Sequence, residues 1–185
     1  MKNNFLILGN SVSGTSLLQS LLNHHLKVEC KYEWFKNTSK KDVEGCLDLW
    51  IEAANSHDKI WGNKIPLEQF FNAEWTNEDI TNLINPFYII FIQRRFSMYA
   101  KQNHNNSAYQ GWWERANEEI YWSMREAEPS KIIAVSFEDL CIRPYVELLR
   151  ICKFLDVKYN KDMMKGTDNV KSRIKKQGCF DLTRV

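Results

Sequence analysis

A short segment rich in glycine and small polar residues, residues 9–16, is the part of the sequence best suited to bind an anion. It follows a continuous apolar run at residues 5–8 and precedes leucines at helical spacing from Leu17 to Leu22. This order predicts a buried strand, a loop and a helix. The backbone N–H groups of such a loop and of a helix N-terminus can surround an anionic group. An ordinary turn rich in small residues is the alternative.

The loop has the glycine spacing of a nucleoside-triphosphate loop but lacks the rest of that chemistry. Such a loop needs a lysine where Thr15 stands, so that the lysine reaches the β and γ phosphates. It also needs an acidic residue after an apolar strand to hold magnesium. The strongest apolar run, residues 87–92, ends in Gln93-Arg94-Arg95 instead. The segment therefore predicts a phosphate loop without the NTPase machinery, and a small-molecule or nucleotide kinase is the weaker alternative.

Strands and helices that would position this loop alternate along the chain. Apolar runs predict strands at residues 5–8, 28–32, 59–65, 87–92 and 131–137. Helices are expected at residues 17–25, 42–55, 67–84, 111–126 and 145–154. This alternation predicts an α/β fold in three layers, with a central, mainly parallel sheet of about five strands, helices on both faces and a relation to P-loop nucleotide folds. We expect a single domain over residues 1–185, in which residues 160–185 form a basic, disordered tail.

Several segments, taken in chain order, resemble the motifs of the sulfotransferases, which use 3′-phosphoadenosine 5′-phosphosulfate (PAPS). Residues 9–18, continued to His25, resemble the loop and first helix that bind the 5′-phosphosulfate. The other segments are Gly62-Asn63-Lys64-Ile65-Pro66, the apolar strand that ends at Arg94, Phe137-Glu138-Asp139-Leu140, and residues 143–157. The match covers residues 5–160 and implies the sulfotransferase fold, with sulfuryl transfer from PAPS to a hydroxyl or amine of a small molecule, glycan or peptide.

The resemblance also assigns the residues that would bind PAPS. Arg94 would bind the 3′-phosphate, and Arg95 is a poorer candidate for that role. Gln102 falls where the family has a serine, and its amide can still donate a hydrogen bond to phosphate. The residues expected to hold the 5′-phosphosulfate are Ser11, Ser13, Gly14, Thr15 and Ser16.

Catalysis in this family needs a cation beside the transferred group and a base for the acceptor proton. The family usually has Lys or Arg at the position of Val12, which can neither donate a hydrogen bond nor neutralise charge. Lys64 ends a strand on the side where α/β sheets bind ligands, so it is the candidate for that cation. Glu33 is the candidate general base, with Glu29 in reserve. No metal is required, and a catalytically weak, nucleotide-binding relative is the second hypothesis.

Composition restricts the class of protein. The chain has 185 residues, of which 44% are hydrophobic and 26% charged, which suits one domain with one core. A net charge of +2 gives no general case for nucleic acid. No apolar run approaches the ~20 residues that span a bilayer, and no signal peptide is recognisable. Five scattered cysteines without a CxxC pair favour a reducing compartment, so we expect a cytoplasmic protein without a membrane partner.

Overall fold

A single parallel sheet forms the centre of the fold. The computed structural model describes residues 3–32, 49–67, 82, 85–95, 121, 125 and 128–167. Within these residues the sheet has five strands in the order β2-β3-β1-β4-β5, and every neighbouring pair is parallel. The strands are β1 (Phe5–Gly9), β2 (Val28–Tyr32), β3 (Ile60–Pro66), β4 (Tyr88–Gln93) and β5 (Ile132–Ser136). The predicted α/β fold with a sheet of about five strands is confirmed.

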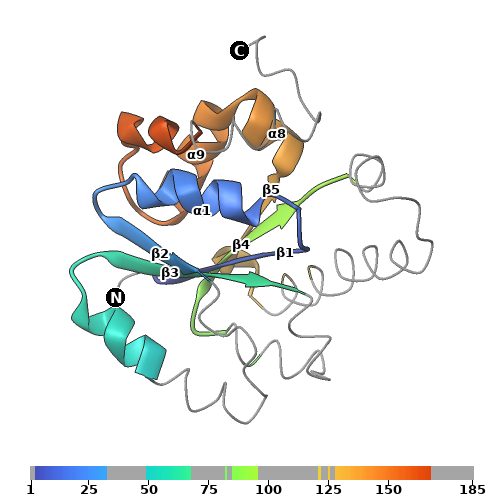
Figure 1. The fold of residues 1–185 in the computed structure, drawn as a ribbon. Coiled ribbons are helices and arrows are strands. Elements are labelled where there is room, and N and C mark those ends of the chain that lie inside the picture. Colours follow the sequence, from blue (N-terminus) through green and yellow to red (C-terminus); the bar gives the residue numbers. More distant parts are fainter. Residues whose placement is uncertain are drawn as a thin grey trace.

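Helices cover both faces of the sheet, as Figure 1 shows. One face carries α1 (Thr15–Asn23), α8 (Phe137–Ile142) and α9 (Pro144–Phe154), and residues 49–56 form a helix on the other face. Side chains of β1 alternate between the two layers, because successive residues of a strand point to opposite faces. Phe5 and Ile7 join the core beneath α1, α8 and α9, whereas Leu6 and Leu8 pack with Trp50. The apolar run of β1 is therefore buried on both sides.

The described helices agree with the sequence patterns except for α8, which the sequence analysis did not predict. Leucines at helical spacing bury one side of α1, and Pro144 occupies the first turn of α9, where its missing N–H costs no hydrogen bond. The sequence predicted a strand that continued to Phe137, but β5 ends at Ser136 and Phe137 begins α8. The cause is a helix cap, because the Ser136 hydroxyl accepts a hydrogen bond from the Asp139 N–H at 3.1 Å. None of the described helices is long and apolar enough to cross a membrane.

The expected C-terminal tail differs from the structure over its first residues. Lys161–Thr167 form a 3-10 helix, η3, rather than a disordered segment. Met163 is fully buried in the core beneath α1 and α9, and the Ser20 hydroxyl donates a hydrogen bond to the Gly166 carbonyl at 3.2 Å. A Cβ on Gly166 would lie 2.7 Å from the backbone of Leu21, so glycine permits this close approach. Residues 168–185 lie outside the described part of the chain.

Candidate functional site

The glycine-containing loop lies where three strands end side by side. Because β1 sits between β3 and β4, its carboxyl end is flanked by both neighbours. Gly9 is in register with Pro66 of β3, and Leu8 is in register with Phe91 of β4. Ligands of open α/β sheets bind beyond the carboxyl ends of the strands. The fold therefore places Lys64, the loop and Arg94 at the edge of the sheet that suits a ligand.

Two residues of the loop have left-handed backbone conformations. The φ angle is +102° at Gly14 and +65° at Val12. Glycine adopts such angles without strain, and at this position it is also required for space, because a Cβ on Gly14 would lie 2.2 Å from the Phe137 ring. A β-branched residue at positive φ is uncommon and carries backbone strain, which concentrates at functional sites. Val12 is held in this strained conformation, with its side chain 44% exposed.

The loop folds back closely over the end of β1. A Cβ on Gly9 would lie 2.6 Å from the Ser13 hydroxyl oxygen and 2.7 Å from Ile92, so only glycine fits beneath the loop. The Ser13 N–H donates to the Asn10 carbonyl at 3.0 Å, which closes a turn. The Ser13 hydroxyl is fully buried and has no hydrogen-bond partner among the residues that the structure describes. The first turn of α1 follows directly, and its N–H groups have no acceptor within the helix.

Arg94 is a buried cation directly beside this loop. Its side chain is only 6% exposed, and its Nη1 donates a hydrogen bond to the Val12 carbonyl at 2.9 Å. The guanidinium also lies over the Phe137 ring, with its carbon 4.6 Å from the ring centroid. The Nε atom is buried and has no hydrogen-bond partner among the described residues. A buried guanidinium with a donor left over is the arrangement expected next to a bound anion.

The neighbouring Arg95 has a different role. Its side chain is exposed, and its backbone N–H donates a hydrogen bond to Glu138 Oε1 at 3.0 Å. The other carboxylate oxygen of Glu138 accepts a hydrogen bond from the Ser136 hydroxyl at 3.3 Å. Glu138 thus ties the end of β4 to the start of α8 and fixes the backbone beside Arg94. The arginine that faces the loop is Arg94.

Lys64 approaches the loop from β3. The lysine is 3% exposed, and its Nζ donates a hydrogen bond to the Ser16 hydroxyl at 3.2 Å. The structure therefore brings together Lys64, Ser16 and, through the loop, Arg94, although these residues are far apart in the sequence. Thr15 is buried in the first turn of α1, and Ser11 is partly buried in the loop.

Cysteines near the two cations are inert. Burial raises the pKa of the Cys141 thiol to about 12, although the charge of Arg94 partly opposes this shift. Burial also raises the pKa of the Cys30 thiol far above its usual value, against the opposing charge of Lys64. Both thiols stay protonated near neutral pH, so they do not act as nucleophiles at this site.

Other sequence-based candidates lie elsewhere or cannot be placed. Glu33 and Gln102 lie outside the described residues. Glu29 forms an ion pair with Lys31, and the hydrogen bond in that pair lowers the pKa of its carboxyl group. It is in register with Trp61, well before Lys64 on β3, so it is not part of the site around Lys64.

The two histidines at the end of α1 have structural roles. His24 caps the helix and its Nδ1 contacts the Ser20 carbonyl at 2.8 Å. The His25 ring is buried and lies between backbone groups of Lys27 and Lys158. Lys165 of η3 is paired with Asp162 at 2.7 Å.

Phe137 and Glu138 support the site, and the sequence did not assign them this role. Their family motif was visible, but the contact of the Phe137 ring with Gly14 and Arg94 arises from the tertiary fold. The local signal that did exist is Ser136, followed three residues later by Asp139, which is typical of a helix start. That pattern predicts that Phe137 and Glu138 occupy the first turn of a helix, directly beside the end of the preceding strand.

Comparison with known proteins identifies the fold. No protein-family model matches the chain, and no curated protein sequence is significantly similar to it. Solved structures do match. The sulfotransferase domain from the curacin biosynthetic pathway superposes with a TM-score of 0.67 and 14% identity, over 90% of this chain and 78% of that chain. The sulfotransferase domain of the Synechococcus PCC 7002 olefin synthase superposes with a TM-score of 0.68 and 15% identity, over 90% of this chain and 78% of that chain.

A mammalian enzyme also matches. Mouse sulfotransferase SULT7A1, solved as a complex with PAP, superposes with a TM-score of 0.56 and 16% identity, over 90% of this chain and 63% of that chain. The chain therefore has the sulfotransferase fold, as the order of its sequence motifs predicted.

Proposed function

We propose that this protein is a sulfotransferase that binds PAPS at the carboxyl edge of its sheet and transfers the sulfuryl group to a hydroxyl or amine. The observation that carries the proposal is the pair of buried cations, Lys64 and Arg94, on either side of a glycine-containing loop. Burying charge is costly unless it is compensated, and two buried cations at one edge favour a ligand with more than one anionic group. A nucleotide with phosphates at both ends of its ribose has this character.

The proposed binding mode follows from the positions of the cations. The loop at residues 11–16 and the N-terminus of α1 would hold the 5′-phosphosulfate. Arg94, whose Nε has no partner within the described part of the chain, would contact the 3′-phosphate, and Gln102 would assist it. The sulfotransferase fold and the PAP complex of mouse SULT7A1 support this assignment. Binding of the nucleotide to the folded chain would satisfy the Arg94 donor that no atom of the described residues satisfies.

The proposed reaction is a sulfuryl transfer. The acceptor oxygen or nitrogen forms a bond to sulfur while the bond from sulfur to the leaving phosphate oxygen breaks, and negative charge builds on that phosphate. Lys64, which already contacts Ser16 of the loop, would stabilise this charge. The acceptor gives up its proton, and Glu33 is the candidate base that receives it. The acceptor would be a small molecule, a glycan or a peptide.

Val12 supports a second candidate function, a sulfotransferase fold used only for binding. An uncharged, exposed side chain stands where the family usually has a cation. Without that cation, transition-state stabilisation must come from elsewhere, and an interaction of this kind is worth 10²- to 10³-fold in rate, on the order of 3–4 kcal/mol. The two functions therefore differ in whether Lys64 compensates for Val12.

Activity of the native chain and of Lys64→Ala distinguishes the two functions. We expect the native chain to transfer the sulfuryl group of PAPS to an acceptor from a broad panel, or to desulfate PAPS slowly. Lys64→Ala should lower the rate by about 10²-fold or more, yet leave the binding of adenosine 3′,5′-bisphosphate largely intact, since that product lacks the sulfuryl group. Lys59→Ala, an exposed lysine just before β3, is the matched control and should keep full activity.

The opposite outcome is equally informative. If the native chain binds the nucleotide but is inert with every acceptor, and Val12→Arg then creates activity, Lys64 does not compensate. The binding function would then be the correct one.

A further inference from the structure

A second basic region lies at the opposite end of the strands, the amino edge of the sheet, around a cavity of about 1140 Å³. The cavity is lined by the turn between α1 and β2, by the end of α9, and by the segment that leads to η3. Its Lys27 directly precedes β2, so the cavity lies at the amino edge of the parallel sheet, away from the loop, Lys64 and Arg94. Nothing in the proposed sulfotransferase function uses this region.

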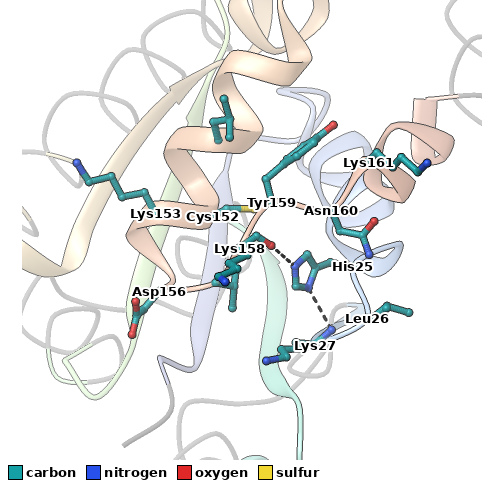
Figure 2. Close-up of a pocket in the computed structure, with 12 residues that line it drawn as sticks. His25, Leu26, Lys27, Cys152, Lys153, Asp156, Lys158, Tyr159, Asn160 and Lys161 are labelled. Carbon is teal, nitrogen blue, oxygen red and sulfur yellow. Dashed lines mark hydrogen bonds between the residues drawn. The ribbon is translucent and has the colours of Figure 1, made fainter.

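The cavity has an excess of unpaired positive charge. Lys27, Lys153, Lys158 and Lys161 line it together with one carboxylate, that of Asp156. Figure 2 shows Lys27, Lys153 and Lys161 on different sides of the pocket. All four lysines are exposed, and no ion pair joins any of them to a carboxylate of the described residues.

Lysines elsewhere in the described part of the chain do have partners. Lys31 and Lys59 pair with Glu29, and Lys131 pairs with Glu128. Lys165 pairs with Asp162, and Lys64 contacts Ser16. Among the described residues, the unpaired lysines are therefore gathered at the cavity, which creates a local positive potential on a chain of nearly balanced charge.

Exposed apolar side chains border the same cavity. Leu26 is 74% exposed and Leu149 is 39% exposed, and both line it. Two more exposed apolar side chains, Tyr145 and Val146, lie on α9 four and three residues before Leu149. Residues three and four apart are neighbours on one face of a helix, so these side chains and Leu149 form an apolar stripe of about 6 Å along α9, a little over one helical turn. Exposed apolar side chains gathered in this way mark an interaction site.

The walls of the cavity are held in place by internal contacts. The His25 ring accepts a hydrogen bond from the Lys27 N–H at Nδ1, at 3.1 Å, and donates one from Nε2 to the Lys158 carbonyl at 2.8 Å. Both bonds are drawn in Figure 2. Tyr145 of α9 packs edge-to-face against Tyr159, with the ring centroids 5.0 Å apart. The cavity is therefore preformed, and both nitrogens of His25 are used within the protein.

We propose that this surface binds an acidic protein segment that carries apolar anchor side chains, such as leucine or phenylalanine. The unpaired lysines would face the acidic side chains, and the cavity with the stripe on α9 would receive the anchors. The apolar stripe extends along α9 past the cavity, which favours a protein segment over a small molecule. The hollow shape, with lysines around its opening, fits a protruding segment better than a flat lipid surface. Binding at the amino edge leaves the carboxyl edge of the sheet open.

The test uses a fluorescein-labelled peptide of glutamate and leucine, with leucines at positions i, i+3, i+4 and i+7, titrated with the full chain. Fluorescence anisotropy should show saturable binding that weakens as salt is added. A lysine–leucine peptide and a glutamate–serine peptide of the same length should bind at least about tenfold more weakly. The double variant K158E/K161E and the variant Leu149→Asp should each lose about tenfold in affinity.

Matched controls exclude a general effect of charge or of folding. Lys131→Glu removes a lysine that is paired with Glu128, away from the cavity, and should bind the peptide as the native chain does. The thermal midpoint of each variant is measured first, and Lys158→Gln with Lys161→Gln replaces the charge reversal if that variant is unstable. The proposal is overturned if the acidic peptide does not bind, if the lysine–leucine peptide binds equally well, or if the cavity variants bind unchanged. It is also overturned if vesicles of phosphatidylserine and phosphatidylcholine bind through these lysines while the peptide does not.

Discussion

The two edges of the sheet both carry positive charge, but they hold it in different ways. At the carboxyl edge, Lys64 and Arg94 are 3% and 6% exposed and have hydrogen bonds to the loop. At the amino edge, the four lysines around the cavity are exposed and have no ion pair among the described residues. Buried cations fixed by neighbours suit a small ligand whose charges have fixed positions. Exposed lysines on flexible stems suit the polar rim of a protein interface.

The difference arises from the elements that form each edge. Loops that follow parallel strands converge on the carboxyl edge, so Lys64, two residues before the end of β3, and Arg94, directly after β4, come from separate segments to one point. The amino edge is formed by the end of α1, the end of α9 and the segment before η3, which leave a hollow between them. A substitution at the carboxyl edge should therefore strongly change stability or nucleotide binding. A substitution at the amino edge should change stability little.

The largest expected effect is that of Gly14→Ala on stability. The new Cβ would meet the Phe137 ring at 2.2 Å, and the residue has a φ of +102°. Overpacking and the left-handed backbone together should lower the free energy of unfolding by about 2–4 kcal/mol. Leu26→Ala, at the amino edge, should change it by less than about 0.5 kcal/mol, because that side chain is mostly exposed. Urea unfolding measures both, and equal losses would contradict the contrast between the edges.

Arg94→Lys should have the next largest effect, on nucleotide binding. A lysine cannot reproduce the planar contacts of a guanidinium that lies over Phe137 and donates to Val12. We expect the affinity for adenosine 3′,5′-bisphosphate to fall by about 1.5–3 kcal/mol, as for hydrogen bonds to charged groups. Arg95→Lys should have much less effect, since the backbone of Arg95, and not its side chain, contacts Glu138. Isothermal calorimetry compares the two, and equal losses would show that Arg94 is not the ligand.

A smaller effect is expected for Glu138, which positions the backbone beside Arg94. Glu138→Ala removes the acceptor of the Arg95 N–H and should weaken nucleotide binding by about 1 kcal/mol, the usual net worth of one hydrogen bond. Glu138→Gln retains an acceptor oxygen at that position and should restore most of the affinity. Calorimetry at matched folded fractions separates this effect from a loss of stability. If alanine and glutamine weaken binding equally, the carboxylate acts through its charge instead.

Much of the fold could be predicted from local sequence patterns, because its strands are buried and its first helix is amphipathic. The apolar runs predicted all five described strands, and the leucine spacing predicted α1. The 3-10 helix η3 could not be predicted in this way, since it is held by contacts across the chain, such as that between Ser20 and Gly166. Its sequence is polar and has no period that would indicate burial of Met163.

The candidate site was predictable in its residue types but not in its contacts. Parallel strands that end at one edge predict that Lys64 and the loop lie near each other, and the structure confirms this with the bond to Ser16. The bond from Arg94 to Val12 could not be predicted, because its acceptor is a backbone carbonyl in a strained, left-handed residue. Every residue has a backbone carbonyl, so the residue type does not indicate which carbonyl will accept a hydrogen bond. The roles of Glu33 and Gln102, which lie outside the described residues, stay predictions.

The most direct test of the central claim is which nucleotide stabilises the folded chain. Thermal unfolding is measured with adenosine 3′,5′-bisphosphate, with ATP and magnesium, and with buffer alone. A ligand that binds only the folded state at a hundredfold excess over its Kd adds about 2.7 kcal/mol, which raises the melting temperature of a chain of this size by about 5–10 °C. We predict that adenosine 3′,5′-bisphosphate gives this rise and that ATP with magnesium gives less. A larger rise with ATP and magnesium would contradict the assignment and indicate a kinase.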